Sequence, residues 1–243
     1  MTKSAPEELS LSQRRRSPTD EEMQSIPWLA VLEPQHQLRA RAALQVGDAK
    51  SGDYVVRVGK PVTYWFGLID GLLKMSNETP DGRSITLIGV PPGGWFGEGT
   101  VLKQENYRYN IQALRPSVVA GIPVETFHWL LDQSIAFNRF VMNQLNERVG
   151  QFIAARESDR MTSPEARVAA GLAGLFNPVL YPGASNILRI TQQELANLVG
   201  LSRQRVNQAL RELELRQLVR IEYGGLKVPN IPALRQAAFV PAA

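Results

Sequence analysis

The 243-residue chain contains no cysteine and only two histidines. Without cysteine thiols it can form neither disulfide bonds nor cysteine-ligated zinc or iron–sulfur sites. It also lacks an uninterrupted apolar run of about 18 residues, the length that predicts a helix across a bilayer. The three arginines at 14–16 are followed by a polar segment, whereas a secretion signal continues with an apolar one. These absences predict a soluble, cytoplasmic protein without a membrane partner.

The shortage of histidine argues against an enzyme. The rival class with a similar pattern of short strands is a cupin-like β-sandwich enzyme, whose metal site needs several histidines and carboxylates converging inside the barrel. Residues 53–123 contain no histidine. A serine hydrolase would need a nucleophile elbow and a suitably placed base, and the sequence offers neither. We therefore expect no catalytic residue and no metal site, and keep the cupin-like enzyme as a remote alternative.

Residues 190–210 predict two short helices joined by a tight turn. Thr191 and Glu194 form a capping box, so the first helix begins at that point. Gly200 permits a left-handed backbone conformation between the helices, and Ser202 is a preferred N-cap for the second helix. This arrangement is typical of a helix-turn-helix, whose second helix enters the major groove of DNA through its N-terminal residues.

The second of these helices has two distinct faces. Apolar residues at helical spacing predict the buried face, at Val206, Leu210 and Leu213. The opposite face carries side chains that can bind base edges through two hydrogen bonds, arginine to guanine and asparagine or glutamine to adenine. We expect base contacts from Arg203, Gln204, Asn207 and Gln208, and phosphate contacts from Thr191, Gln193, Ser202 and Arg205. The alternative is an ordinary helical hairpin with a solvated polar face.

The segment after these helices predicts a wing. Residues 217–223 and 226–228 are rich in β-forming side chains and flank Gly224 and Gly225, a pair typical of a tight hairpin turn. Helix, turn, helix and hairpin together predict a winged helix-turn-helix. The charge distribution agrees, since residues 161–243 contain nine basic and five acidic side chains, and this excess of four equals the net charge of the whole chain. Such an excess attracts DNA phosphates irrespective of sequence.

The preceding half of the chain predicts an antiparallel β-sandwich or barrel, and so an α+β fold overall. Short β-rich runs alternate with turn signals rich in glycine and proline, which is the pattern of many short antiparallel strands. The runs lie at 54–58, 63–69, 72–75, 84–88, 109–113 and 118–122. A helical pattern precedes them over residues 26–44, and helical character resumes at residue 124.

A long helix is predicted from about residue 134 to residue 160, with Ser134 as its cap. Alternate spacings of three and four residues define a heptad seam at Met142, Leu145, Val149, Phe152 and Arg156. The fitting partner for such a seam is the same helix of a second subunit. A homodimer also suits DNA binding, because proteins with two-fold symmetry read palindromes. The alternative is that the helix packs on its own β-domain through the off-seam residues Phe140, Val141 and Ile153.

The order of β-sandwich, long helix and winged helix-turn-helix resembles the cyclic AMP receptor / fumarate–nitrate regulator (Crp/Fnr) family of transcription regulators. The resemblance extends from about residue 26 to residue 228. Its strongest matches are Ile190-Thr-Gln-Gln-Glu-Leu-Ala with Gly200-Leu-Ser-Arg, and Pro92-Gly-Gly-Trp-Phe-Gly-Glu, which resembles the start of the family's phosphate-binding cassette. The implied partners are double-stranded DNA, a second copy of the chain and, for an activator, RNA polymerase.

With this resemblance the chain divides into five segments. We expect a flexible tail at 1–25, a cyclic-nucleotide-binding-like effector domain at 26–133, a dimerisation helix at 134–160, the DNA-binding domain at 161–232 and a second tail at 233–243. The first tail is assigned because residues 1–25 are polar and rich in serine, proline and glutamate, a composition typical of disorder.

The same resemblance implies a small effector bound in the β-domain. In the family's cyclic nucleotide binders, a Gly-Glu pair opens a short helical turn and an arginine follows at a fixed spacing, which Gly97, Glu98 and Arg108 keep. Glu98 can accept a hydrogen bond from a ribose hydroxyl, and Arg108 can bind a phosphate through two hydrogen bonds. Backbone amides beside Gly97 and Gly99 can add anion-binding donors. The alternative is a salt bridge between Glu98 and Arg108, with the glycines as turn residues only.

The chain departs from the cyclic AMP binders at four of the expected effector positions. It has Tyr109 and Asn110 where they have a small hydroxyl residue and alanine, and Phe152 and Ile153 where they have a polar Thr-Ser pair on the dimer helix. These side chains reduce the space for a nucleotide and remove contacts to its base. The effector stays open between cyclic AMP, another small molecule and none, and the last case gives a constitutive DNA-binding regulator.

Overall fold

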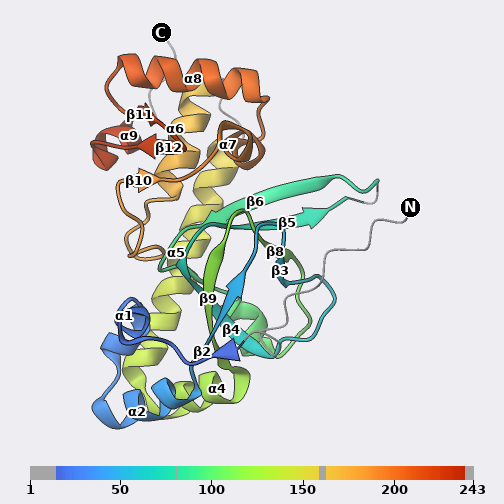
Figure 1. The fold of residues 1–243 in the computed structure, drawn as a ribbon, viewed down its shortest axis with the longest axis vertical. Helices are drawn as coiled ribbons and strands as arrows, with labels where there is room; N and C mark the ends of the chain where they lie inside the picture. Colours follow the sequence, from blue (N-terminus) through green and yellow to red (C-terminus); the bar gives the residue numbers. More distant parts are fainter. Residues whose placement is uncertain (1–14, 80, 159–162, 239–243) are drawn as a thin grey trace. The chain divides into compact units, whose positions relative to one another are not determined.

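The computed structural model describes residues 15–79, 81–158 and 163–238, which form helices and antiparallel sheets in the α+β arrangement that the sequence predicts (Figure 1). Its contacts divide the chain into two compact units. The first comprises residues 1–146 and 179–183, and the second comprises residues 147–178 and 184–243. This division falls inside the long helix, whereas the sequence predicts boundaries at the ends of that helix.

The first unit is built on two antiparallel sheets. The five-stranded sheet has the order β1 (Arg15–Arg16), β2 (Gln45–Ala49), β9 (Ser117–Pro123), β4 (Tyr64–Asp70) and β7 (Trp95–Phe96). The four-stranded sheet has the order β3 (Tyr54–Val56), β8 (Asn110–Ala113), β5 (Leu73–Glu78) and β6 (Ser84–Val90). All six β-rich runs that the sequence predicts contain a strand, so the prediction of a many-stranded antiparallel domain is confirmed.

Strand β2 has no counterpart among the predicted strands. Its residues, Gln-Val-Gly-Asp-Ala, include only one β-branched side chain and no aromatic one, so they carry little β-propensity. The strand forms because it has a partner on each side. It pairs with β9 from Gln45 opposite Gly121 to Ala49 opposite Ser117, and with β1 along its other edge.

Tryptophan side chains fill the core of the first unit. Trp28, Trp65 and Trp95 are at most 3% exposed, and their ring centroids lie between 4.6 and 5.7 Å apart. Such aromatic contacts stabilise a core beyond the area that they bury. Gly67 lies opposite Trp95 in the β4–β7 pair, where a Cβ would lie 2.3 Å from the tryptophan ring. The bare backbone of Gly67 therefore lets β7 pack closely against β4.

The helical pattern of residues 26–44 is divided between two helices. The 3₁₀ helix η1 (Pro27–Val31) is followed by α2 (Pro34–Ala43), with Leu32 and Glu33 in extended conformations between them. The residue before a proline is driven out of the helical region, whereas proline itself suits the first turn of a helix. Pro34 therefore begins a new helix, which packs against α4 (Val124–Gln133).

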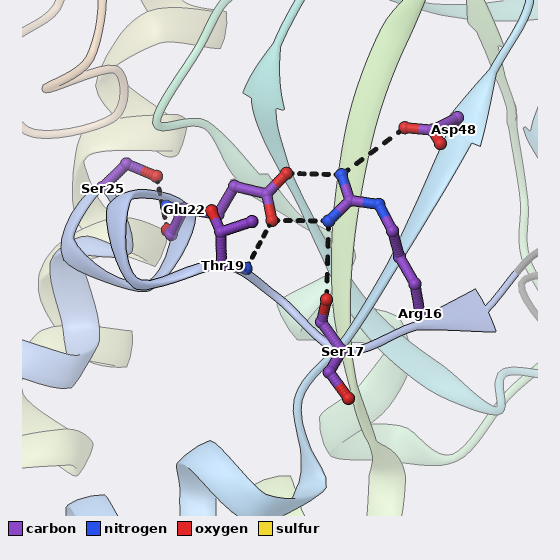
Figure 2. Close-up of polar contacts among 6 residues, drawn as sticks. All are labelled: Arg16, Ser17, Thr19, Glu22, Ser25 and Asp48. Atoms are coloured by element: carbon purple, nitrogen blue, oxygen red, sulfur yellow. Dashed lines mark hydrogen bonds and ion pairs between the residues drawn. The ribbon is translucent and has the colours of Figure 1, made fainter.

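Residues 15–25 fold onto the first unit, where the sequence analysis expects part of a flexible tail. Strand β1 pairs with β2, and helix α1 (Asp20–Gln24) begins with a capping box between Thr19 and Glu22. The Arg16 guanidinium donates to both carboxylate oxygens of Glu22, at 2.7 and 2.5 Å, and lies 3.6 Å from Asp48 on β2 (Figure 2). The hydrogen bonds from Arg16 hold the pKa of Glu22 down at about 2. We call Arg16, Thr19, Glu22 and Asp48 the N-terminal clasp; residues 1–14 of the expected tail lie outside the described residues.

Helix α5 (Ile135–Ser158) confirms the predicted long helix. Ser134 Oγ accepts a hydrogen bond from Phe137 N at 3.2 Å, so Ser134 caps the helix as predicted. Several large apolar side chains of α5 are between 43% and 73% exposed, at Ile135, Met142, Val149, Phe152 and Ile153. Others pack against the core of the first unit, completely at Val141 and partly at Phe140 and Leu145.

The second unit holds the remaining helices and a small sheet. Helix α6 (Pro164–Gly174) begins after the N-cap Ser163 and is followed by α7 (Gln192–Val199) and α8 (Arg203–Leu215). A three-stranded antiparallel sheet has the order β10 (Ile187–Leu188), β12 (Gly225–Lys227) and β11 (Arg220–Glu222). These elements confirm the predicted winged helix-turn-helix.

The chain continues into a further helix, α9 (Ile231–Ala237), where the sequence analysis expects a tail from residue 233. Asn230 caps this helix by accepting a hydrogen bond from Ala233 N at 3.0 Å. Leu234 is fully buried, and Arg235 donates to the Phe176 carbonyl at 3.0 Å. Because α9 packs against α6, residues 233–238 belong to the fold of the second unit.

Five residues between α6 and β10 belong to the first unit, and we call residues 179–183 the crossing segment. Gln144 of α5 donates to the Val179 carbonyl at 2.8 Å, and Tyr181 is only 1% exposed. Gly183 approaches the turn at residues 91–94 backbone to backbone. A Cβ on Gly93 would lie 2.5 Å from Gly183 N, so this contact needs glycine at residue 93.

Candidate DNA interface and effector cassette

Local capping positions the two helices of the helix-turn-helix. Thr191 Oγ1 accepts from Glu194 N at 3.1 Å, and the Glu194 carboxylate accepts from Thr191 N at 2.6 Å, which confirms the capping box. Gly200 ends α7 in the left-handed region at φ 65°, as predicted. Arg167 of α6 donates to the Val199 carbonyl at 2.9 Å. The last turn of α7 is thus held from outside the motif by a residue that the sequence analysis does not single out.

Helix α8 has the two faces that its sequence predicts. Val206, Leu210 and Leu213 are fully buried, which anchors the helix in the unit. The residues expected to contact bases lie on the other side: Arg203, Gln204 and Gln208 are exposed, and Asn207 is half-buried. Arg and amide side chains at the exposed start of such a helix can reach base edges in the major groove.

The residues expected to contact phosphates lie at the starts of α7 and α8. Ser202 Oγ accepts a hydrogen bond from Arg205 N at 3.3 Å, so the hydroxyl of this exposed N-cap can still donate its own hydrogen. Gln193 donates to Asn197 Oδ1 at 3.1 Å on the exposed face of α7. A phosphate oxygen can replace this exposed acceptor at little cost, since net hydrogen-bond energies at such a surface are about 1 kcal/mol. Arg205 is exposed.

The wing turn lies one residue earlier than predicted. Glu222 pairs with Gly225, so Tyr223 and Gly224 form the two-residue turn, with Gly224 at φ 77°. Gly225 lies within β12, where a Cβ would lie 2.6 Å from the Leu188 carbonyl oxygen of β10. Gly225 therefore allows close packing of the strands and is not part of the turn. A Gly-Gly pair in the sequence does not show which of these two roles each glycine has. Tyr223 at the tip is fully exposed.

The cassette, which we define as residues 91–110, opens its helix as predicted. Gly97 is buried, has a left-handed φ of 87° and precedes α3 (Glu98–Lys103). The Glu98 side chain is buried, at 2% exposure. Gly99 is exposed, and a Cβ there would meet open space, so no close contact requires glycine at this position.

The Arg108 side chain is turned toward solvent. Its guanidinium donates to the Glu105 carboxylate at 2.7 Å, and its side chain is 74% exposed. Its ion pair is therefore with Glu105 within one loop, and not with Glu98 as the alternative interpretation of the motif expects. The structure keeps the spacing of Gly97, Glu98 and Arg108 without bringing the two charged side chains together.

The two residues after Arg108 are held by the surrounding loops. Asn110 is buried, and its Oδ1 accepts from Val58 N at 3.0 Å. The Tyr109 hydroxyl lies 3.4 Å from the position that a Cβ on Gly97 would take. Tyr107 donates from its hydroxyl to the Tyr64 carbonyl at 3.0 Å, and burial beside Tyr109 raises the pKa of that hydroxyl.

Phe152 and Ile153, the remaining expected effector residues, lie on α5 in the second unit. Their side chains are 43% and 56% exposed. Their part in effector binding stays a prediction. Among residues 15–79, 81–158 and 163–238, no group of three histidine, aspartate or glutamate side chains is placed to hold a metal ion. No helix in this part of the chain is long and apolar enough to cross a membrane.

Two family models match separate parts of the chain: the cyclic nucleotide-binding domain over residues 48–134 and the Crp-like helix-turn-helix domain over residues 166–237. The transcriptional regulator LdrP of Thermus thermophilus is 27% identical over 183 residues, which cover 74% of this chain and 90% of that protein. The cAMP-activated global transcriptional regulator CRP of Pasteurella multocida is 25% identical over 171 residues, or 68% of this chain and 80% of that protein.

Solved structures share the fold at lower sequence identity. FixK2 from Bradyrhizobium japonicum has a TM-score of 0.66 at 13% identity, covering 82% of this chain and 99% of that one. The cassette thus lies within one matched domain, and the exposed start of α8 lies within the other.

Proposed function

The chain belongs to the Crp/Fnr family of transcription regulators, and we propose that it acts as a homodimer that reads an inverted repeat in double-stranded DNA. The exposed side chains at the start of α8 are the main support for this proposal. Arg203, Gln204 and Gln208 are exposed there, while Val206 and Leu210 anchor the same helix in the core. A rigid helix that displays base-reading side chains at its N-terminal end is the recognition helix of a helix-turn-helix.

The exposed side of α5 supports the dimer. Met142 and Val149 are 59% and 58% exposed and lie one heptad apart, with Phe152 following at the next seam position. Apolar side chains in a heptad pattern are stabilised when a second helix packs against them. A second copy of the chain supplies such a helix, and its recognition helix would then read the other half of a palindrome.

Control by a small molecule at the cassette is the second part of the proposal. The cyclic nucleotide-binding domain model covers this region, and the relative from Pasteurella multocida is named as activated by cyclic AMP. The ion pair between Arg108 and Glu105 is exposed, and exposed pairs stabilise by only about 0–1 kcal/mol. An anionic effector can therefore recruit Arg108 at little cost. The alternative is a regulator that binds DNA without an effector, and contact with RNA polymerase would make either form an activator.

A binding selection on random double-stranded DNA tests the proposal. The full chain should enrich an inverted repeat whose half-site centres lie about 10–10.5 base pairs apart, one turn of DNA. Parallel selections with and without cyclic AMP separate effector-dependent from effector-free binding. Enrichment of no sequence, or of an isolated half-site bound by a monomer, would contradict the proposed function.

A further inference from the structure

The Tyr109 side chain lies over the glycine that opens the cassette helix. Its hydroxyl oxygen is 3.4 Å from the place of a Cβ on Gly97, which is van der Waals contact. Gly97 is buried, and the next residue, Glu98, is 2% exposed. The Tyr109 hydroxyl therefore lies directly beside the start of this segment.

The backbone on both sides of Tyr109 is fixed. Asn106 forms a β-bridge with Pro61, and Tyr107 is hydrogen-bonded in both directions, from its N to the Lys60 carbonyl at 2.9 Å and from Gly59 N to its own carbonyl at 2.7 Å. On the other side, Asn110 Oδ1 accepts from Val58 N at 3.0 Å. Because both neighbours are held, Tyr109 can move away from Gly97 only by rotation of its side chain. The ring centroids of Tyr107 and Tyr109 lie 6.2 Å apart, so this rotation would also separate the two rings.

Arg108, the expected charged partner of a phosphate, is turned toward solvent in this structure. Arg108 is 74% exposed and bonded to Glu105. A phosphate held by this family's cassette needs an arginine and backbone donors within about 2.7–3.1 Å of its oxygens. Because Arg108 can leave its exposed pair with Glu105 at little cost, the obstacle to a cyclic nucleotide phosphate is the Tyr109 side chain beside Gly97.

We propose that Tyr109 is a specificity-determining residue that occupies the phosphate position of the cassette and excludes 3′,5′-cyclic nucleotides. This inference rests on the proposed function, because it concerns the effector site of the same regulator. It would separate the present chain from its relatives that are named as cAMP-activated, although Gly97, Glu98 and Arg108 keep the spacing on which the resemblance rests. The contact beside Gly97 is made by the hydroxyl at the end of the Tyr109 side chain, so truncation of this side chain should open the space.

Isothermal titration calorimetry of the full chain with cyclic AMP and cyclic GMP tests this proposal. The wild type should give no saturable binding at millimolar nucleotide, because its Tyr109 hydroxyl lies beside Gly97. Tyr109→Ala and Tyr109→Ser should gain saturable binding of at least one of the two nucleotides. That gain should be lost in Tyr109→Ala combined with Arg108→Ala, since the phosphate then lacks its charged partner.

Tyr54→Ala is the matched control, because Tyr54 is half-buried in the same unit but its ring packs under Arg57, outside the cassette. This variant should remain without nucleotide binding. Saturable binding by the wild type would overturn the proposal. So would the absence of a gain in a Tyr109→Ala or Tyr109→Ser protein whose melting temperature matches that of the wild type. None of these titrations uses DNA, so they leave the selection experiment as the separate test of the proposed function.

Discussion

Arg203 and Arg205 lie two residues apart at the start of α8, and both side chains are exposed. Positions two apart on an α-helix are separated by about 200° around its axis. When the helix enters a groove, we expect one of them to face the bases and the other to face the sugar–phosphate wall. The guanidinium groups of the two arginines should then have different functions, and substitution can distinguish them.

Replacing Arg203 by alanine should weaken binding to the selected site by about 1–3 kcal/mol, because a two-fold hydrogen bond to one base is lost. Preference should relax at a single position of each half-site and remain unchanged elsewhere. A repeated selection with this variant checks both effects. An unaltered motif with unaltered affinity would falsify the base-reading role.

Replacing Arg205 by alanine is the matched comparison. A lost phosphate contact weakens all DNA sequences alike and removes about one released counterion from the salt dependence. The affinity should therefore fall for specific and random DNA by the same factor, and the slope of log K against log salt should become shallower by about one per subunit. A changed sequence motif for this variant would place Arg205 at the bases instead.

Glu22 gives a prediction about pH. Its folded-state pKa of about 2 lies below its ordinary value, so its ion pair with Arg16 stabilises the fold fully above the ordinary carboxylate range. As the pH falls toward 2, protonation removes this stabilisation. Glu22→Gln should lower the free energy of unfolding near neutral pH by about 0.5–1 kcal/mol, the value of a good surface pair, and the difference from the wild type should shrink as the pH falls.

Chemical unfolding at several pH values measures that difference. Glu21→Gln is the control, since Glu21 is exposed in the same helical turn and lies outside the clasp. A loss of stability that is equal for the two variants, or that is the same at every pH, would show that the clasp contributes nothing specific.

The motif residues of the cassette illustrate what the sequence can and cannot predict at this scale. Spacing alone identifies Gly97, Glu98 and Arg108, and the structure confirms Gly97 as the left-handed residue before α3. Spacing cannot predict the direction of a long side chain on an exposed loop, where Glu105 competes for the arginine. Nor can it predict the contact of Tyr109 with Gly97, which depends on how two loops meet.

At the scale of elements, the exposed side of α5 yields the prediction about oligomeric state. Leu145 packs partly against the core of its own unit, so its substitution would disturb the fold as well as the seam. Met142 and Val149 are exposed, and Met142→Glu with Val149→Glu would place like charges along a two-fold seam without loss of core packing.

Sedimentation of this double variant should give a monomer where the wild type gives a dimer, with binding to the palindrome strongly weakened. Ala136→Glu with Asn143→Glu is the matched control, because both residues are exposed on the same helix, one heptad apart, and lie about 100–120° from Met142 around the helix axis. It should remain dimeric. A dimer in the Met142/Val149 variant would mean that the subunits associate through another surface.

Elements whose signals are local were predicted best. The capping box at Thr191, the left-handed Gly200 and the apolar spacing of α8 all act within a few residues, so the sequence contains the whole cause. Strand β2 depends on a partner far along the chain, β9, so a window of sequence that does not include this partner contains no sign of the strand. The N-terminal clasp is different, because its capping box and its Arg16–Glu22 pair are local signals within a segment whose polar composition predicts a tail.

At the scale of the molecule, the crossing segment has a consequence for exchanging parts between related proteins. A chimera with one crossover near residue 160 would take the turn at 91–94 from one parent and residues 179–183 from the other. Gly93 and Gly183 are in backbone contact, and Tyr181 lies against Gly94, so any larger residue at 93 or 94 would clash with the incoming segment. Chimeras that take 91–94 and 179–183 from the same parent should melt higher than those that mix them. The two units are interleaved in the sequence, so a single crossover cannot exchange them as intact modules.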